Sequence, residues 1–165
     1  MANESKVQQL KSTMKNHSAE NMWGDFLNAH LEFAFEHTPK VYHFFDNEKD
    51  ANHNLELVIS GVKKATSYSL LGLQQQKKAL PKRGDFTVLT DVDGKAKCIL
   101  RTTSVRMMPF FSITAEHAKM EGQGDGGLAD WQRVYWEFFQ RELKEFERKP
   151  NESMIIVCEY FEKVF

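Results

Sequence analysis

The sequence has little cysteine, no long apolar run and almost no net charge. Two cysteines, Cys98 and Cys158, occur in 165 residues, each inside an apolar segment. Their number and spacing fit neither a disulfide framework nor a zinc site, so we expect reduced residues of the core. No apolar run approaches the length that crosses a bilayer, and residues 3–15 lack the apolar stretch of a signal peptide. We therefore expect a soluble, cytoplasmic protein with no membrane partner.

The balance of charge argues against a long nucleic acid as the main partner. Lysine and arginine number 22 against 23 aspartate and glutamate, so no strong field attracts a phosphate backbone. We expect no DNA binding, and contact with RNA would have to be local. Apolar residues make up 41% of the chain, which is enough for one packed core. We interpret residues 18–165 as a single domain and residues 1–17 as a polar segment that forms a loosely packed helix.

Apolar periodicity and turn signals predict both helices and strands. Ser18 is expected to cap a helix whose apolar face extends from Met22 to Phe35. Asp93-Gly94 predicts a β-hairpin whose second arm is long enough to bend round a barrel. The other expected elements are helices at 51–60 (capped by Asp46), 114–122 (capped by Thr114) and 128–143, strands at 65–70, 86–90, 96–108 and 154–161, and an exposed loop at 74–78.

The pattern Gly61-x-Lys63-x-x-Thr66 lies between an expected helix and an expected strand. The glycine can end the helix in the left-handed region. The lysine and the threonine then follow at a junction where side chains can point into a cleft. The alternative is an ordinary helix exit followed by a solvated lysine. Because the pattern is much shorter than a phosphate-binding loop, the six residues alone leave both interpretations open.

Lys63, Thr66 and Glu121 form the candidate catalytic set. A hydroxyl becomes a nucleophile when a base takes its proton, and a lysine can be that base when burial lowers its pKa. A carboxylic acid can then protonate the leaving group. The alternative for Glu121 is a solvated residue at a helix end. His117 shares its helix face, but two ligands are too few for a metal ion, so we expect no metal, no cofactor, and an exposed or capping histidine.

Two further patterns suggest phosphate binding. Six cations near the motif, with Tyr68 among them, could form a local patch for a phosphate-bearing ligand, or only a solvated loop. The glycine-rich residues 122–127 lack the ending of a phosphate-binding loop, and no strand precedes them. The six cations are Lys63, Lys64, Lys77, Lys78, Lys82 and Arg83.

As an ordered set, the motifs of this chain are similar to those of the ASCH domain family, within the PUA-like superfamily. The resemblance covers most of the chain and points to a longer bacterial subgroup of cytoplasmic proteins. It implies an α+β fold in which a small β-barrel is flanked by helices. The motifs that carry it are Gly61-x-Lys63-x-x-Thr66, Pro81-x-x-Gly84-Asp85, Val105-x-x-x-Pro109-Phe110, Glu121-Gly122-x-Gly124-Asp125 with Trp131 and Phe138-Phe139, and Cys158-Glu159.

The resemblance implies two kinds of function. PUA-like relatives bind RNA, ASCH domains were proposed to do so through the motif cleft, and one member is a ribonuclease. A small member is an amidohydrolase that removes the acetyl group of N4-acetylcytidine. It uses the motif lysine as proton acceptor, the motif threonine as nucleophile and a helix glutamate as proton donor. The resemblance carries these roles to Lys63, Thr66 and Glu121, with Lys64, Ser67 and Tyr68 as ligand-binding residues.

Several residues depart from the subgroup, which often has threonine for Lys64, glutamate for Gln123, histidine for Tyr135 and Gly-Asp for Phe45-Asp46. Fewer titratable groups therefore lie near the site, but the catalytic set is unchanged. Our leading hypothesis is a hydrolase that binds a modified nucleoside or nucleotide and cleaves an amide on it. The alternatives are a non-catalytic module that binds short RNA, and a protein-interaction scaffold.

Overall fold

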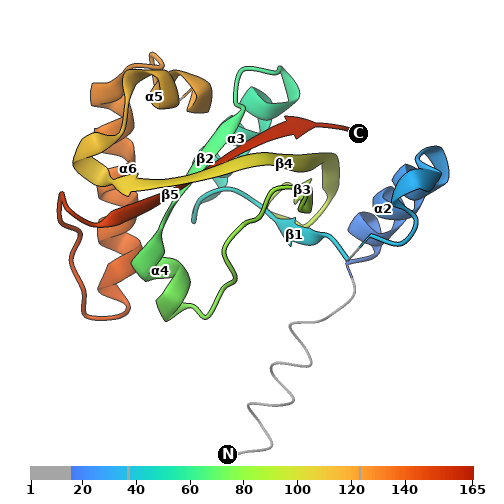
Figure 1. Cartoon of the computed structure of the whole chain (residues 1–165), viewed down its shortest axis with the longest axis horizontal. Coiled ribbons are helices and arrows are strands. Elements are labelled where there is room, and N and C mark those ends of the chain that lie inside the picture. Colours follow the sequence, from blue (N-terminus) through green and yellow to red (C-terminus); the bar gives the residue numbers. More distant parts are fainter. Residues whose placement is uncertain (1–15, 37, 123) are drawn as a thin grey trace, which may run out of the picture.

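One five-stranded sheet forms the centre of the computed structural model, which describes residues 16–36, 38–122 and 124–165. Its strands lie in the order β1-β3-β4-β5-β2, antiparallel except that β1 runs parallel to β3. The sheet is curled into a half-barrel with helices around it, so the expected α+β fold is confirmed (Figure 1). The strands are β1 (Lys40–Tyr42), β2 (Ala65–Ser69), β3 (Phe86–Thr90), β4 (Ala96–Pro109) and β5 (Ile155–Lys163).

The helices flank this sheet, with α3 and α4 between its two ends (Figure 1). In Figure 1, α5 and α6 cover one end and α2 lies at the other. None of the helices in the described part of the chain is long and apolar enough to cross a membrane. The helices are α2 (His17–Ala29), α3 (Glu48–Ile59), α4 (Leu70–Gln75), α5 (Ala115–Glu121) and α6 (Leu128–Lys144), with short 3₁₀ turns η1 (Leu31–Phe33) and η2 (Phe110–Ser112).

The long strand β4 allows the sheet to curl. It pairs with β3 along its first part and with β5 along its second, and the register with β5 shifts between Thr102 and Ser104. Such a bulge bends a strand and increases its twist. The predicted hairpin between β3 and β4 is confirmed, and Gly94 takes the left-handed conformation that its turn requires, with φ of 82°.

Side chains alternate along β5 and so contribute to two separate cores. Ile156 and Cys158 pack with Trp131 of α6. Phe161 packs on the other side of the strand with Leu55 of α3. Both cysteines are free and buried, as predicted, and burial raises the pKa of Cys98 to about 11 and that of Cys158 to about 12.

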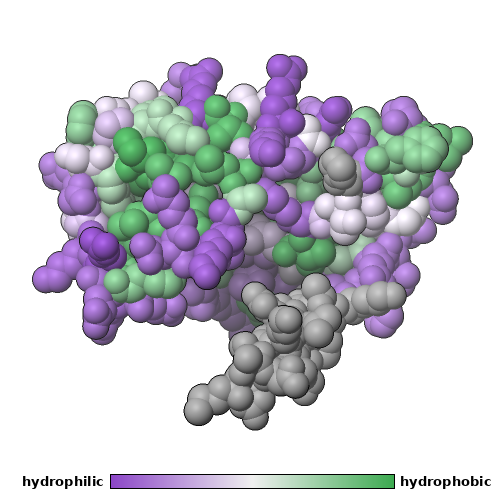
Figure 2. Space-filling view, turned by 60° about the horizontal axis from the view of Figure 1, so that its bottom comes forward, coloured by the Kyte–Doolittle hydropathy of each residue, from purple (hydrophilic) through white to green (hydrophobic). Residues whose placement is uncertain are grey.

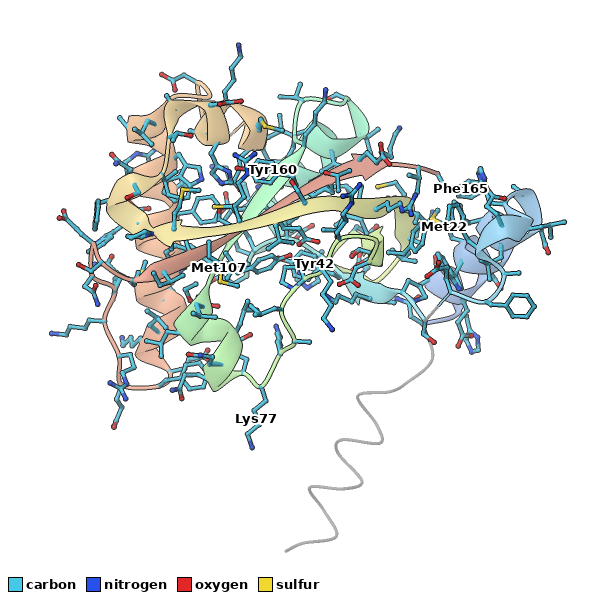
Figure 3. The ribbon with its side chains drawn as sticks, in the orientation of Figure 1. Met22, Tyr42, Lys77, Met107, Tyr160 and Phe165 are labelled. Carbon is cyan, nitrogen blue, oxygen red and sulfur yellow. The ribbon has the colours of Figure 1, made fainter. Side chains whose placement is uncertain are left out.

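Helix α2 covers the far end of the sheet, where Phe26 packs against Phe86. The expected continuation of this helix to Phe35 is wrong, because α2 ends at Ala29 and the Phe35 side chain is fully exposed. Hydrophobic surface is visible at this end of the molecule (Figure 2). Figure 3 labels Met22 and Phe165 at this end, where the ring of Phe165 packs on that of Phe26 with centroids 5.8 Å apart. The helix expected within residues 1–17 lies almost entirely outside the described residues.

The caps of α2 and α3 differ from the prediction. Asn16 caps α2, and the Ser18 hydroxyl instead accepts a hydrogen bond from the N–H of Ala96 in β4. Asn47 caps α3, whereas the Asp46 carboxylate pairs with Arg141 of α6. In both cases the predicted cap is recruited by a residue from a distant part of the chain.

Two elements were not predicted. Strand β1 has only three residues, and helix α4 occupies part of the expected loop at 74–78. Other features follow the prediction, since Thr114 caps α5 and Gly122 ends it with φ of 71°.

Candidate functional site

The motif lysine is positioned where the ends of two helices meet. Gly61 ends α3 with φ of 79°, and the N–H of Lys63 then donates to the carbonyl of Leu57 at 2.9 Å. The N–H of Lys64 donates to the carbonyl of Met120 in α5 at 2.7 Å. The chain after α3 is therefore tied to the C-terminal turn of α5, which brings Lys63 next to the last residue of that helix. The predicted helix exit at Gly61 is confirmed.

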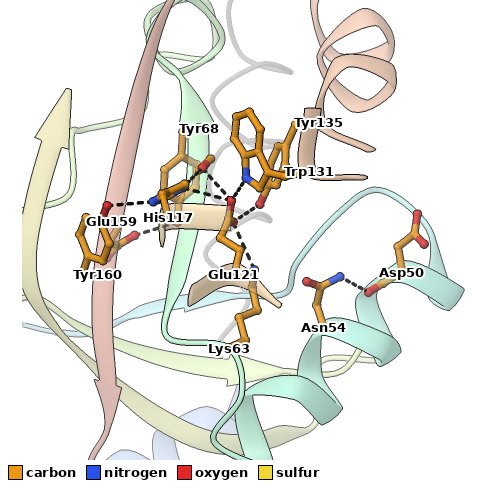
Figure 4. A network of polar contacts seen from close by, with 11 residues as sticks. Asp50, Asn54, Lys63, Tyr68, His117, Glu121, Trp131, Tyr135, Glu159 and Tyr160 are labelled. Atoms are coloured by element: carbon orange, nitrogen blue, oxygen red, sulfur yellow. Dashed lines mark hydrogen bonds and ion pairs between the residues drawn. The ribbon is translucent and has the colours of Figure 1, made fainter. Parts of the chain in front are cut away.

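Glu121 is that last residue of α5, and its side chain is fully buried. The alternative of a solvated carboxylate is wrong. Its oxygen Oε1 lies 3.3 Å from Nζ of Lys63, and Oε2 accepts a hydrogen bond from the Ser67 hydroxyl at 3.0 Å. Figure 4 shows Glu121 at the centre of these contacts. The side chains around it, here called the Glu121 network, are Lys63, Ser67, His117, Trp131 and Tyr135.

Burial and charge shift the pKa values of this pair. Burial alone would raise the pKa of Glu121, but the Lys63 cation and the bonds from His117 and Tyr135 outweigh it and lower the pKa to about 2. Burial lowers the pKa of Lys63, and the attraction of Glu121 offsets this only in part. The Phe44 ring covers the ammonium group, with Nζ 5.2 Å from the ring centroid. The site thus combines an ionised carboxylate with a lysine that loses its proton more readily than usual.

His117 links the network to a partly exposed tyrosine. Its Nδ1 lies 2.9 Å from the hydroxyl of Tyr160, and its Nε2 lies 2.8 Å from the Ser67 hydroxyl and 3.2 Å from Glu121. A carboxylate at that distance favours a proton on Nε2, so Tyr160 donates to Nδ1. The expectation of an exposed or capping histidine is wrong, because His117 is buried. No group of three metal-ligating side chains occurs in the described residues.

Thr66 reaches the network through a tyrosine. It is buried in β2, and its interaction with the Tyr135 hydroxyl lowers the pKa of that phenol, which in turn donates a hydrogen bond to Glu121. Burial and the charge of Glu121 raise the pKa of Tyr135 well above its usual value, so the phenol keeps its proton. Lys63 and Glu121 are therefore in direct contact, and Thr66 is joined to them by one hydrogen-bonded side chain.

A cavity of about 710 Å³ lies beside this network. It opens between the two edge strands β1 and β2 and is bounded by α6 and by the chain from α4 to Pro81. Of the predicted site residues, Ser67 and Tyr68 line the cavity. Lys64 is exposed and does not line it, and Lys63, Thr66 and Glu121 are buried and do not line it. Its aromatic lining residues are Tyr42, Phe45, Tyr68 and Phe138.

Two carboxylates in the cavity wall were not predicted as site residues. Glu159 accepts hydrogen bonds from Tyr68 at 2.9 Å and from Thr102 at 2.6 Å. Glu142 accepts from Ser69 at 3.0 Å, and burial raises its pKa. The sequence signals for Glu159 were a charged residue within the apolar run of β5 and the motif Cys158-Glu159, whereas Glu142 looks like an ordinary polar residue of α6.

The main chain of β2 also faces the cavity. Phe161 donates its N–H to the carbonyl of Lys64 at 3.0 Å, so in this antiparallel ladder every second residue of β2 bonds to β5. Ser67 is then one of the residues that direct N–H and C=O to the free edge of the sheet, where the cavity lies. A ligand can pair with this donor and acceptor as a further strand would.

Neither predicted phosphate site keeps its form. Lys63 is buried against Glu121 and cannot belong to a surface patch, although Lys78 lines the cavity. In the glycine-rich loop, carboxylates already occupy main-chain donors, since Asp125 accepts from the N–H of Gly127 at 2.6 Å and Asp130 from that of Asp125 at 3.1 Å. Gln123 lies outside the described residues.

Comparison with known proteins finds similarity to ASCH domains, the family whose motifs the sequence resembles. A model of the ASCH domain matches residues 40–165. The crystal structure of an ASCH domain from Lactobacillus crispatus JV V101 is 29% identical, with a TM-score of 0.84, over 89% of this chain and 94% of that one. Protein EF3133 from Enterococcus faecalis V583 is 31% identical, with a TM-score of 0.81, over 90% of this chain and 88% of that one. No match was found among curated proteins.

Proposed function

The chain belongs to the ASCH domain family, and from the geometry around Glu121 we propose that it hydrolyses an amide on a modified nucleoside held in the adjacent cavity. The observation that carries the proposal is the buried pair of Lys63 and Glu121, 3.3 Å apart. Burial lowers the pKa of the lysine, which is the condition for a lysine to act as a base. N4-acetylcytidine is the first substrate to test, since the family resemblance implies it.

The cavity supports a ligand of nucleoside size. Its volume falls within the usual range for small-molecule sites, about 300–1,000 Å³. Tyr42, Tyr68 and Phe138 offer faces on which a planar base can stack. The carboxylates of Glu142 and Glu159 can accept hydrogen bonds from ring or exocyclic N–H groups, and they would repel a phosphate more than a neutral ligand.

In the proposed reaction, the Lys63 ammonium group, whose pKa is lowered by burial, first loses a proton to solvent. Thr66 Oγ then forms a bond to the acyl carbon while the neutral Lys63 amine takes the hydroxyl proton. The carbon–nitrogen bond then breaks and the amine leaves with a proton. Water finally hydrolyses the acyl-threonine ester. Because its pKa is about 2, Glu121 has no proton to give in this state. We therefore assign proton return to Lys63 and positioning of Lys63 to Glu121, which modifies the role expected for the glutamate.

Turnover of N4-acetylcytidine, followed by chromatography of the products, tests this proposal. Thr66→Val keeps the shape of the side chain but removes the nucleophile, so turnover should be abolished. Removing a general base usually lowers the rate by about 100- to 10,000-fold, which is the loss expected for Lys63→Met if it remains folded. Thr103→Val, at an exposed threonine of β4, is the matched control and should retain full activity. Undiminished turnover by Thr66→Val would contradict the mechanism.

Binding of short RNA in the same cavity, without catalysis or as a ribonuclease, is the second candidate. It is supported by Lys40 and Lys78, which line the cavity. Contacts with phosphates release counterions, so RNA affinity should fall steeply as salt is added. A salt-dependent gel shift together with no turnover of any acylated nucleoside would select this candidate.

A further inference from the structure

Phe45 stands between the cavity and the Glu121 network. Its side chain lines the cavity, and its ring packs on Tyr135 and Phe138 with centroid distances of 5.7 and 5.2 Å. Tyr135 in turn holds both Thr66 and Glu121. The Phe45 ring therefore lies between the cavity and Tyr135, the side chain that interacts with both Thr66 and Glu121.

The residues on either side of Phe45 contact Lys63 and helix α6. The Phe44 ring lies over the ammonium group of Lys63 at 5.2 Å. Asp46 forms two hydrogen bonds with Arg141 of α6, at 2.9 and 3.2 Å. Residues 44–46 thus cover Lys63, cover Tyr135 and are fastened to α6 by a pair of exposed charges.

The backbone of Phe45 is strained. Its φ is 57°, a left-handed value that is an outlier for a bulky residue. Lys77 and Glu147 also have φ of 55°, but each follows the end of a helix, where this conformation is common. Phe45 instead lies between β1 and α3. Strain of this kind persists where the surroundings hold it in place, and it is frequent at ligand clamps and switch regions.

We propose that residues 44–46 form a gate, with Phe45 as its closing side chain, that decides whether a ligand in the cavity reaches Thr66 and Lys63. In the closed state the ring covers Tyr135 on the side of the cavity. Opening separates Phe45 from Tyr135, releases the left-handed backbone and breaks the Asp46–Arg141 pair. That pair is exposed and therefore weak, so it holds the gate without locking it. The aromatic face of a ligand can replace the Phe45 ring against Phe138.

The gate rests on the proposed function only in naming Thr66 as the residue to be reached, so the experiment measures access and needs no turnover. Thr66→Cys is treated with iodoacetamide, and mass spectrometry follows alkylation at position 66 and at Cys98. Cys98 is buried in the core that includes Leu55, and it reports global unfolding. An open minor state is typically populated at about 0.1–10%. Adding Phe45→Gly should therefore speed labelling at position 66 by about 10- to 1,000-fold, with no change at Cys98.

Three further variants separate the ring from its surroundings. Phe45→Ala should give nearly the same acceleration as Phe45→Gly, because each removes the ring. Asp46→Asn, a surface change that leaves the core intact, should speed labelling at position 66 by about 2- to 5-fold, as expected for loss of a weak exposed pair. Phe111→Ala, at an exposed phenylalanine outside the wall, should change nothing.

The gate is refuted if position 66 reacts equally fast with and without the Phe45 ring in folded protein. If loss of the ring also speeds labelling at Cys98, the ring variants are partly unfolded and the Asp46→Asn variant provides the test. An unchanged labelling rate at position 66 in Asp46→Asn then refutes the gate. Ring-dependent labelling without turnover would keep the gate and reject the hydrolase. Turnover of N4-acetylcytidine together with labelling that does not depend on the ring would keep the hydrolase and reject the gate.

Discussion

Glu121 in the network is fully buried and Glu142 in the cavity wall is half-buried, and their pKa values move in opposite directions. Glu121 contacts the Lys63 cation and four further donors, and its pKa falls to about 2. Glu142 accepts hydrogen bonds from the neutral donors Ser69 and Gln76, and burial raises its pKa although these bonds and the charge of Lys78 act to lower it. Neutral hydrogen bonds therefore do not offset the loss of hydration, whereas a buried cation does. The network thus holds an ionised carboxylate, whereas burial in the cavity wall makes the Glu142 carboxyl harder to ionise.

The largest expected effect is loss of the network carboxylate. Glu121→Ala leaves Lys63 buried without a counter-charge, which usually costs about 3–5 kcal/mol in the free energy of unfolding. Glu142→Ala leaves neutral partners next to the cavity, where water can replace the carboxylate, so we expect a loss of about 1 kcal/mol. Urea unfolding of both variants measures the difference, and equal losses would remove the distinction between the two regions.

A matched double variant shows whether the unpaired charge of Lys63 causes the loss of stability. Replacing Lys63 by methionine in the Glu121→Gln background removes both charges and keeps similar side-chain volumes. Its free energy of unfolding should lie above that of either single variant, because no buried charge is then left without a partner.

The next effect is the dependence of stability on pH. The folded pKa of Glu121 lies below its unfolded value of 4.5, so its contribution is complete above about pH 4.5 and is lost as pH falls toward 2. That shift corresponds to roughly 3 kcal/mol. Glu142 has the opposite sign, since a raised pKa gives stability at low pH that is lost as pH rises through the folded value. Urea unfolding from pH 7 to pH 2 should show an acid loss that is smaller in Glu121→Gln, and Glu142→Gln should match or exceed the parent at pH 7.

A smaller loss of stability is expected when either of two tyrosines that donate to carboxylates is replaced by phenylalanine. Tyr135→Phe removes a donor to ionised Glu121 and leaves Thr66 without its partner, which should cost about 1.5–3 kcal/mol. Tyr68→Phe removes a donor to Glu159, which keeps Thr102 and can bind water from the cavity, so we expect about 1 kcal/mol. Thermal unfolding of both variants ranks them, and the reverse order would contradict the closed character of the network.

The smallest effect is expected at the surface between the two regions. Arg141→Ala breaks the exposed pair with Asp46 and should cost no more than about 1 kcal/mol. The hydrogen bonds and charge of Arg141 hold the pKa of Asp46 below its usual value, and salt should weaken that attraction. Unfolding at low and high salt checks this prediction. A loss as large as that of Glu121→Ala would show that Arg141 supports the core.

Local chemistry could be predicted from the sequence, and long-range geometry could not. Gly61, Gly122 and Thr114 each have a function set by their immediate neighbours, and all three behave as predicted. The contact of Lys63 with Glu121 joins residues 58 apart in the chain. The two were combined in the candidate catalytic set for their chemistry, but local spacing could not show that they meet. Their assigned catalytic roles stay predictions.

The errors share a physical cause, because short elements take their burial from tertiary contacts. Strand β1 and helix α5 have three and seven residues, too few for an apolar period to show which side is covered. His117 was therefore expected at the surface, yet it is buried by Trp131 and Tyr160. Phe35 fits the apolar period of α2, but the chain leaves the helix before reaching it.

The place of β5 in the sheet determines when the sheet can be completed during synthesis of the chain. This strand follows the other four in the chain, yet it lies between β4 and β2, and it pairs Ala65 with Tyr160. During synthesis β2 has no sheet partner until β5 emerges from the ribosome. The apolar side chains and main-chain hydrogen-bonding groups of β2 stay exposed until then. Contacts between such distant segments are the slow step of folding. A nascent chain that stalls before β5 would be a natural target for chaperones and proteases.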